Sequence, residues 1–132
     1  MSVELEELSE SECRGRLARA RLGRVGVTIG ALPAILPVNY ALLDGDIVFR
    51  TGEGTKLRAA LERAVVAFEI DGIDEIERSG WSVLVVGHAS TIRLAHDLEA
   101  ARRLVLRPWA PGDRDRYVRI TTGMISGRRI SI

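Results

Sequence analysis

The 132-residue chain has only one cysteine, one lysine and two each of tryptophan, tyrosine and phenylalanine. A lone cysteine, Cys13, cannot form an internal disulfide and suits a reducing compartment, so we expect a cytoplasmic protein. No apolar run approaches the about 20 residues that cross a membrane. Residues 1–12 are acidic and lack the apolar centre of a signal peptide. We therefore expect no membrane association.

An excess of one charge is also absent, because 19 basic residues accompany 18 acidic residues and leave a formal net charge of +1. The arginines are spread along the chain and form no stripe that would predict nucleic-acid binding. His88 and His96 have no cysteine, histidine or carboxylate at metal-ligand spacing, so no metal site is predicted. The length fits a single domain, residues 1–132.

The predicted helices are few and short. Ser9 and Glu12 form a capping box, so the first helix should begin at Ser9 and end before Gly23. Apolar residues at helical spacing predict two further helices, which begin near Thr55 and Asp97. Helical segments this short leave most of the chain to strands and turns.

Alternation of apolar and polar residues predicts the strands. An Asp44-Gly45 pair between two apolar runs predicts a two-residue hairpin turn. Pro37, in the first arm, has no N–H for a ladder hydrogen bond, which indicates a sheet edge or a bulge. We expect interruptions of the last strand at Gly123 and Gly127, and an acidic connection at residues 71–80. The expected strands cover residues 24–30, 34–43, 46–51, 65–70, 81–92 and the chain from residue 117.

Strands therefore dominate the predicted fold, and few connections are long enough to be helical crossovers. A doubly wound parallel sheet is excluded on this ground. About six mostly antiparallel strands in so short a chain favour a closed or nearly closed barrel, which leaves no exposed sheet edge. The predicted fold class is mainly β, a β-barrel with short helices.

The only lysine, Lys56, lies in the run FRTGEGTKLRAAL, where a predicted strand is followed by a predicted helix. Lys56 and Arg58 add positive charge to the first turn of that helix, an end that is already positive. A bound phosphate would offset this cost, with backbone N–H groups, Thr51 and Thr55 as donors. The glycine spacing matches neither a Walker A loop nor a dinucleotide-binding fingerprint. The alternative is a solvated turn that binds nothing.

Four segments together resemble the pyridoxamine 5′-phosphate oxidase-like proteins, which are flavin-binding split-barrel proteins. The segments are LPAILPVNYALLDGDIVFRTGEGTKLRAAL, VVAFEIDGID, GWSVLVVGHA and RPWAPGDRDRYVRI. The nearest branch is the small one that includes nitroimidazole-reductase-like members. The resemblance implies a six-stranded antiparallel split barrel of the FMN-binding type. It also implies a homodimer with flavin mononucleotide (FMN) in two clefts at the subunit interface.

The resemblance also implies cofactor contacts for individual residues. The strand–turn–helix segment corresponds to the part of the family that holds the flavin phosphate. Its candidate residues are Arg50, Thr51, Thr55 and Lys56. A second segment corresponds to the strand beside the isoalloxazine ring, where backbone groups can make the contacts. Its candidate residues are Val38, Asn39 and Tyr40.

Three further candidates follow from the same resemblance. Trp81 and Ser82 correspond to a strand that approaches the cofactor from the partner subunit, although a packing role explains the tryptophan better. Trp109 lies between prolines on a loop that could form a wall of the cleft. The catalytic residues stay unknown, since a flavin carries the redox chemistry and requires no catalytic dyad.

The C-terminal run MISGRRISI departs from true pyridoxamine 5′-phosphate oxidases, because it lacks their tryptophan-and-arginine motif for the substrate phosphate. We therefore do not expect the activity that names the family. The resemblance implies an FMN-dependent oxidoreductase acting on a small-molecule redox substrate, such as a nitroaromatic compound or a quinone. The alternatives are a deazaflavin-dependent reductase, a non-catalytic flavin- or haem-binding protein, and a dimeric interaction module without a ligand.

Overall fold

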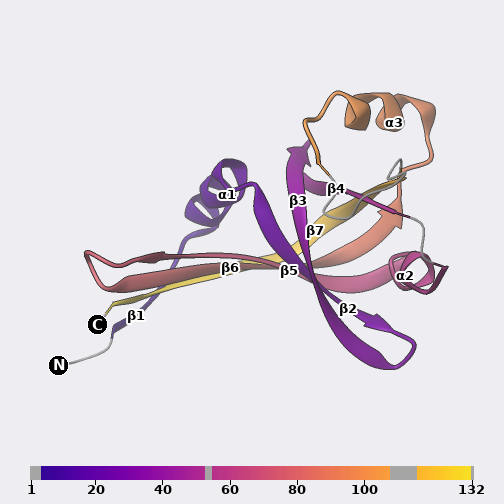
Figure 1. The fold of residues 1–132 in the computed structure, drawn as a ribbon. Helices are drawn as coiled ribbons and strands as arrows, with labels where there is room; N and C mark the ends of the chain where they lie inside the picture. Colours follow the sequence, from indigo (N-terminus) through magenta and orange to yellow (C-terminus); the bar gives the residue numbers. More distant parts are fainter. Residues whose placement is uncertain (1–3, 53–54, 108–115, 132) are drawn as a thin grey trace.

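The structure is a computed structural model that describes residues 4–52, 55–107 and 116–131, and only the backbone of residues 55 and 56. Figure 1 shows the arrangement of the elements. None of the described helices is long and apolar enough to span a membrane. The elements are β1 (Glu4–Glu7), α1 (Glu10–Arg19), β2 (Leu22–Ile29), β3 (Leu32–Leu43), β4 (Asp46–Thr51), α2 (Thr55–Ala60), β5 (Ala64–Asp74), β6 (Ser79–Thr91), α3 (Ala95–Arg102) and β7 (Arg116–Ser131).

Six of the strands close a barrel. Hydrogen-bonded neighbours follow the order β1-β7-β4-β3-β2-β5-β6, and β6 pairs in addition with β7. Every pairing is antiparallel. The ring formed by β2 to β7 is therefore complete, and the predicted mainly β fold, a six-stranded antiparallel barrel with short helices, is confirmed.

β1 is a seventh strand that the sequence analysis did not predict. Its four residues are all exposed, and it pairs with the C-terminal end of β7 outside the ring. The register places Glu6 opposite Arg129 and Glu7 opposite Arg128. Opposite charges at opposed positions stabilise an antiparallel pair. Because β1 buries no apolar face, its sequence carries no alternation that would predict a strand.

β7 is one continuous strand of 16 residues, so the predicted interruptions at Gly123 and Gly127 are wrong. Both glycines serve close packing instead. A Cβ atom on Gly127 would lie 2.6 Å from the Sγ of Cys13, and one on Gly123 would lie 2.9 Å from the carbonyl oxygen of Val86. Gly123 is the extra residue of a β-bulge, where the register with β6 shifts.

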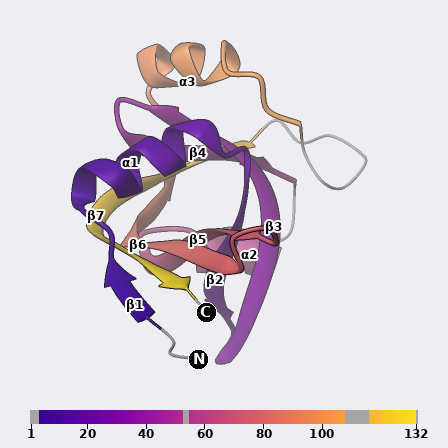
Figure 2. The same cartoon turned by 90° about the vertical axis from the view of Figure 1, so that its left-hand side faces the viewer.

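α1 begins where the capping box predicts. The Ser9 hydroxyl accepts a hydrogen bond from the N–H of Glu12 at 3.1 Å. The helix ends at Arg19, earlier than expected, and Gly23 lies within β2 instead of stopping the helix. A Cβ atom on Gly23 would overlap the ring of Phe68. Figure 2 shows α1 lying against β7 on the outside of the barrel.

We expected residues 71–80 to be an acidic connection, but in the structure they form the end of a long β5–β6 hairpin. β5 continues to Asp74 and β6 begins at Ser79. The Asp74 carboxylate accepts hydrogen bonds from the N–H groups of Ile76 and Glu77, both at 3.0 Å, and so stabilises the turn. Together with β1 and the end of β7, this hairpin extends the sheet beyond the barrel (Figure 1).

Two apolar cores hold the described residues together. One fills the barrel and includes the largest fully buried side chains, Phe49, Phe68, Ile47, Leu61 and Ile70. A second, smaller core lies on the outer side of β4 and β7, where α3 covers the sheet. Its buried residues are Val48, Ile92, Ala101, Leu106 and Tyr117.

Gly87→Ala should destabilise the barrel, because a Cβ atom there would lie 1.9 Å from the carbonyl oxygen of Thr121 on the facing strand. We expect the free energy of unfolding, measured by urea denaturation, to fall by about 2–3 kcal/mol. Gly26→Ala is the matched control. Its Cβ atom would make an ordinary contact at 3.5 Å with that of Ala67, so a similar loss at both positions would contradict the packing described.

Candidate functional site

The ladder between β3 and β4 stops before the strands do. It starts at the predicted two-residue turn, where Asp44 and Gly45 both have positive φ. The last cross-strand pair is Tyr40 with Phe49. Beyond it, β3 pairs only with β2, and β4 only with β7. No ladder joins the two strands there, and we call this gap in the pairing, between Asn39 and the end of β4, the opening.

The β3 edge at this opening has backbone groups without a strand partner among the residues that the structure describes. The N–H of Tyr40 donates to the carbonyl oxygen of Arg21 at 3.0 Å, on the β2 side. Backbone groups alternate in direction along a strand, so those of Pro37 and Asn39 point the other way, toward the opening. The missing N–H of Pro37 therefore removes no hydrogen bond from the ladder with β2, as expected of a proline at a sheet edge. Asn39 presents an N–H and a C=O to the opening.

The side chains of Val38 and Tyr40 point into the barrel core. Tyr40 packs edge-on against Phe68, with ring centroids 4.8 Å apart. Its hydroxyl donates to the carbonyl oxygen of Leu17 at 2.6 Å and links β3 to the end of α1. Burial raises the pKa of Tyr40 to about 12. Of Val38 and Tyr40, only the backbone groups could therefore contact a ligand on the surface of the barrel.

Asn39 and Arg50 hold the chain that follows α3 against the opening. The Asn39 Nδ2 donates to the carbonyl oxygen of Arg107 at 2.8 Å. The Arg50 Nη1 donates to that of Leu106 at 3.2 Å, and its guanidinium lies 5.5 Å from the centroid of the Tyr117 ring. Both predicted site residues therefore have a positioning role within the protomer, which the sequence did not indicate.

The predicted strand and helix are present in this order, since β4 ends at Thr51 and α2 begins at Thr55. The side chains of Thr55 and Lys56 lie outside the described part of the structure, as does the whole of Trp109. The phosphate contacts assigned to Thr51, Thr55 and Lys56 therefore stay predictions. So does the role of Trp109 as a wall of the cleft.

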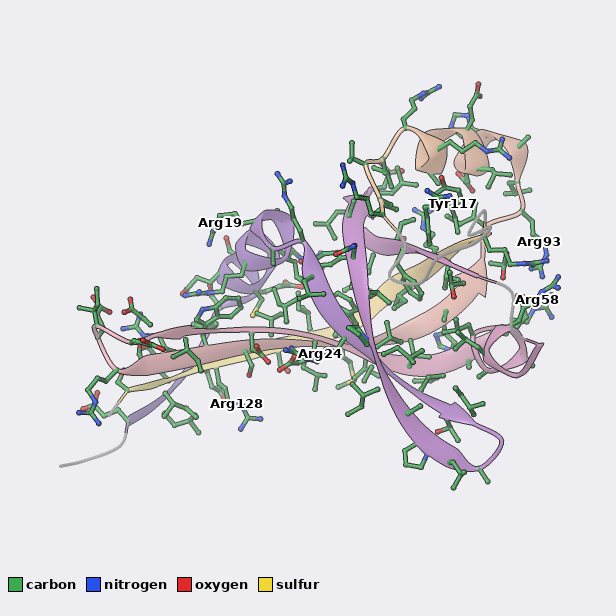
Figure 3. The ribbon with its side chains drawn as sticks, viewed as in Figure 1. Arg19, Arg24, Arg58, Arg93, Tyr117 and Arg128 are labelled. Carbon is green, nitrogen blue, oxygen red and sulfur yellow. The ribbon has the colours of Figure 1, made fainter. Side chains whose placement is uncertain are left out.

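An ion pair anchors the chain directly after α2. Glu62 accepts two hydrogen bonds from Arg93, at 2.8 and 3.0 Å. The hydrogen bonds and charge of Arg93 hold the pKa of Glu62 below its ordinary value. Arg93 precedes α3, so the pair joins the end of α2 to the start of α3. Figure 3 shows Arg93 and Arg58 at the same end of the molecule as α2.

Trp81 and Ser82 lie on opposite faces of β6, because successive strand residues alternate. The Trp81 indole covers Gly72, where a Cβ atom would lie 2.6 Å from the indole nitrogen. The guanidinium of Arg16, on α1, lies 4.4 Å from the centroid of the Trp81 ring. Trp81 is thus packed between α1 and the sheet, which supports the packing role.

The other face of β5, β6 and β7, which we call the outer sheet face, exposes apolar side chains. On β6, Leu84 is 40% exposed between two fully buried valines. Val86 lies between Ala67 of β5 and Met124 of β7, and Met124 is 71% exposed. An exposed apolar patch on a sheet is typical of an interaction surface.

Charged residues flank this apolar centre on both sides. Arg24 contacts both Glu69 and Asp71 at 3.1 Å. Burial and the neighbouring Asp71 raise the pKa of Glu69. In register, Ser82 lies between Asp71 and Arg128, and Arg128 extends from the sheet beyond the barrel (Figure 3). Among the described residues, no three His, Cys, Asp or Glu side chains gather as metal ligands.

Residues 9–129 match the sequence model of the pyridoxamine 5′-phosphate oxidase family. The chain belongs to this family. An uncharacterized protein of Mycobacterium tuberculosis is 37% identical over 132 residues, which cover 96% of this chain and 86% of that protein. The match confirms the resemblance that the sequence motifs indicated.

Solved structures of other proteins have the same fold. The FAD binding protein from Mycobacterium smegmatis is 37% identical, with a TM-score of 0.82 over 96% of this chain and 99% of that chain. A FAD-binding protein from Mesorhizobium loti is 23% identical, with a TM-score of 0.76 over 99% of this chain and 100% of that chain. The second likeness shows the fold alone.

Tyr40→Phe should lower the free energy of unfolding at pH 7 by about 1–2 kcal/mol, because the Leu17 carbonyl loses its hydrogen-bond donor. The unfolded chain releases the tyrosine proton above about pH 10, while the raised pKa keeps it bound in the folded protein. The stability of the wild type should therefore fall between pH 10 and 12, and the difference from the variant should shrink.

Urea denaturation at pH 7, 10 and 11.5 checks this expectation. Tyr117→Phe is the control, because the Tyr117 hydroxyl forms no hydrogen bond with the described residues. A difference between Tyr40→Phe and wild type that stays constant up to pH 11.5 would contradict the assigned role of the hydroxyl.

Proposed function

We propose that the protein binds a flavin nucleotide, FMN, and transfers electrons between it and a small molecule. The observation that carries the proposal is the 37% identity, over 96% of this chain, with the FAD binding protein from M. smegmatis. FAD contains the ring, the ribityl chain and the first phosphate of FMN, so a site for FAD includes the groups that hold FMN. FAD itself is therefore the second candidate cofactor.

The opening between β3 and β4 suits the ring of a flavin. The polar edge of that ring alternates carbonyl oxygens with an N–H group. The unpaired N–H and C=O of Asn39 offer complementary partners along a strand edge. Backbone recognition of this kind requires no particular side chain, so it is compatible with the core positions of Val38 and Tyr40.

The resemblance assigns the flavin phosphate to the start of α2. Thr51 ends the strand beside the opening, and Thr55 and Lys56 begin the helix that follows. A phosphate bound there would offset the positive charge of Lys56 and Arg58 in the first turn. The ion pair of Glu62 with Arg93 keeps the other end of this segment in place.

The residues of the chain bind and orient, and the flavin, when bound, supplies the redox chemistry. Asn39 and Arg50 hold residues 106 and 107 across the ends of β3 and β4. This segment limits access to the opening from one side. We propose that a second copy of the chain covers the other side of the opening and controls access to the flavin from there.

The outer sheet face supports a homodimer. A two-fold axis along β6 would place β5 of one copy opposite β7 of the other. The group of Arg24, Glu69 and Asp71 has a net charge of −1 and would then face the single positive charge of the partner copy's Arg128. Leu84 and Met124 would be buried between the copies, with Ser82 in the same interface.

Purified protein should carry a yellow flavin, which mass spectrometry of the released molecule identifies as FMN or FAD. We expect Lys56→Ala to weaken flavin binding at least about tenfold, because it removes the cation that contacts the phosphate. The thermal stability of the flavin-free protein should not change, and Lys56→Arg should retain most of the affinity. A colourless protein that takes up haem or a deazaflavin but no flavin would disprove the choice of cofactor.

A redox function is distinguished from storage of the cofactor by kinetics. The bound flavin, once reduced by dithionite, should be reoxidised by a nitroaromatic compound or a quinone faster than free flavin is. Reoxidation no faster than that of free flavin would leave a binding protein and disprove the oxidoreductase.

Leu84→Glu should convert a dimer into a monomer, because it places a charge at the apolar centre of the outer sheet face. Sedimentation velocity at micromolar concentration measures this, and flavin affinity should fall with the dimer. Leu94→Glu is the control, since Leu94 is also exposed but precedes α3, away from this face. A monomeric wild type that binds flavin fully would contradict the proposed arrangement.

A further inference from the structure

A cavity of about 600 Å³ lies beside Asn39, on the side of β3 that faces α1. Its walls come from the end of α1, the residue before β2, the end of β3 and the segment after α3. This volume is within the range of small-molecule sites. None of the flavin contacts assigned above, apart from Asn39 and Tyr40, lies in its lining.

One side of the cavity is an edge of β3 that has no neighbouring strand within the described part of the chain. The bond from Tyr40 to the carbonyl oxygen of Arg21 is followed by no further pairing on this side, because β2 begins only at Leu22. The backbone groups of Leu42 point in the same direction as those of Tyr40. They therefore face the cavity. The hydrogen bond of Tyr40 with Leu17 fixes one wall against the other.

The charge of the lining has one sign. Arg21 and Arg107 both line the cavity, and no aspartate or glutamate of residues 4–52, 55–107 and 116–131 does. Neither arginine forms an ion pair with another described residue, whereas Arg24, Arg93 and Arg119 each contact a carboxylate. Two arginines in the lining of one concave site raise its positive potential, and their guanidinium groups can offer paired donors to a carboxylate or phosphate.

The remainder of the lining is largely apolar. Leu17, Ala20 and Ala41 form part of the wall, and Val105 stands at the cavity with 89% of its surface exposed. Asn39 also belongs to the lining, and its amide is hydrogen-bonded to the carbonyl oxygen of Arg107, another lining residue. The cavity thus combines an apolar wall, two cations and a position next to the proposed ring site.

We propose that this cavity binds a small, partly apolar anion, in which a planar body carries a carboxylate or a phosphate. If the proposed flavin function holds, on which this assignment rests, two molecules have this chemistry. One is an anionic redox substrate held next to the ring. The other is the adenosine diphosphate half of FAD.

Binding of 2-naphthoate to the full-length protein without flavin tests the cavity directly. Amide NMR shifts should change at Ala41 and Leu42 and at the Asn39 side chain. We expect 2-naphthoate to bind about tenfold more tightly than the neutral 2-naphthylmethanol of the same shape. Arg21→Gln and Arg107→Gln should each reduce this preference several-fold. Arg102→Gln, on the exposed end of α3, is the control and should leave it unchanged.

The affinities of FMN and FAD for the same variants separate the two sources of the anion. Weaker FAD binding with unchanged FMN binding would assign the cavity to the adenosine diphosphate half. Unchanged affinity for both, with weaker 2-naphthoate binding, would assign it to a separate substrate. Equal binding of 2-naphthoate and its neutral analogue, or variants that behave like Arg102→Gln, would overturn the proposal. If the protein bound 2-naphthoate but no flavin, the proposed flavin function would be disproved and the anion site in the cavity would stand.

Discussion

The pairing of β7 with three other strands is the constraint on which the rest of the structure depends. β7 closes the barrel between β4 and β6, and its second half leaves the barrel together with the β5–β6 hairpin. That extension carries β1 and supports α1. It is possible because Gly123 and Gly127 allow Val86 and Cys13 to approach the strand closely.

Closure by β7 also explains why the barrel can open elsewhere. β4 is bonded to β7 along its length, so it stays in place after its ladder with β3 ends at Phe49. β3 is held in the same way by β2. The backbone of Asn39 then has no ladder partner on β4, and the fold does not depend on one. In the proposed function, the flavin ring takes the place of a strand beside β3 and hydrogen-bonds to the backbone of Asn39.

Several features were predictable because they depend on local geometry. The Asp44-Gly45 turn requires two positive φ angles, and the Ser9 cap requires only the first turn of its helix. Predictions failed where a distant partner decides the outcome. Gly123 and Gly127 suggest breaks in a strand until the residues that approach them are known. β1 has no pattern of its own, because its pairing depends on the edge of β7.

The sequence by itself determined the family, the antiparallel barrel and the segment from Thr51 to Lys56 as a candidate phosphate site, because these follow from residue types at short spacing. Only the tertiary structure decided which faces the side chains occupy. It directed Tyr40 inward, separated Trp81 from Ser82, and brought Arg21 and Arg107 to one cavity. Strand register and long-range pairing decide such positions, and neither is encoded in a local pattern of residues.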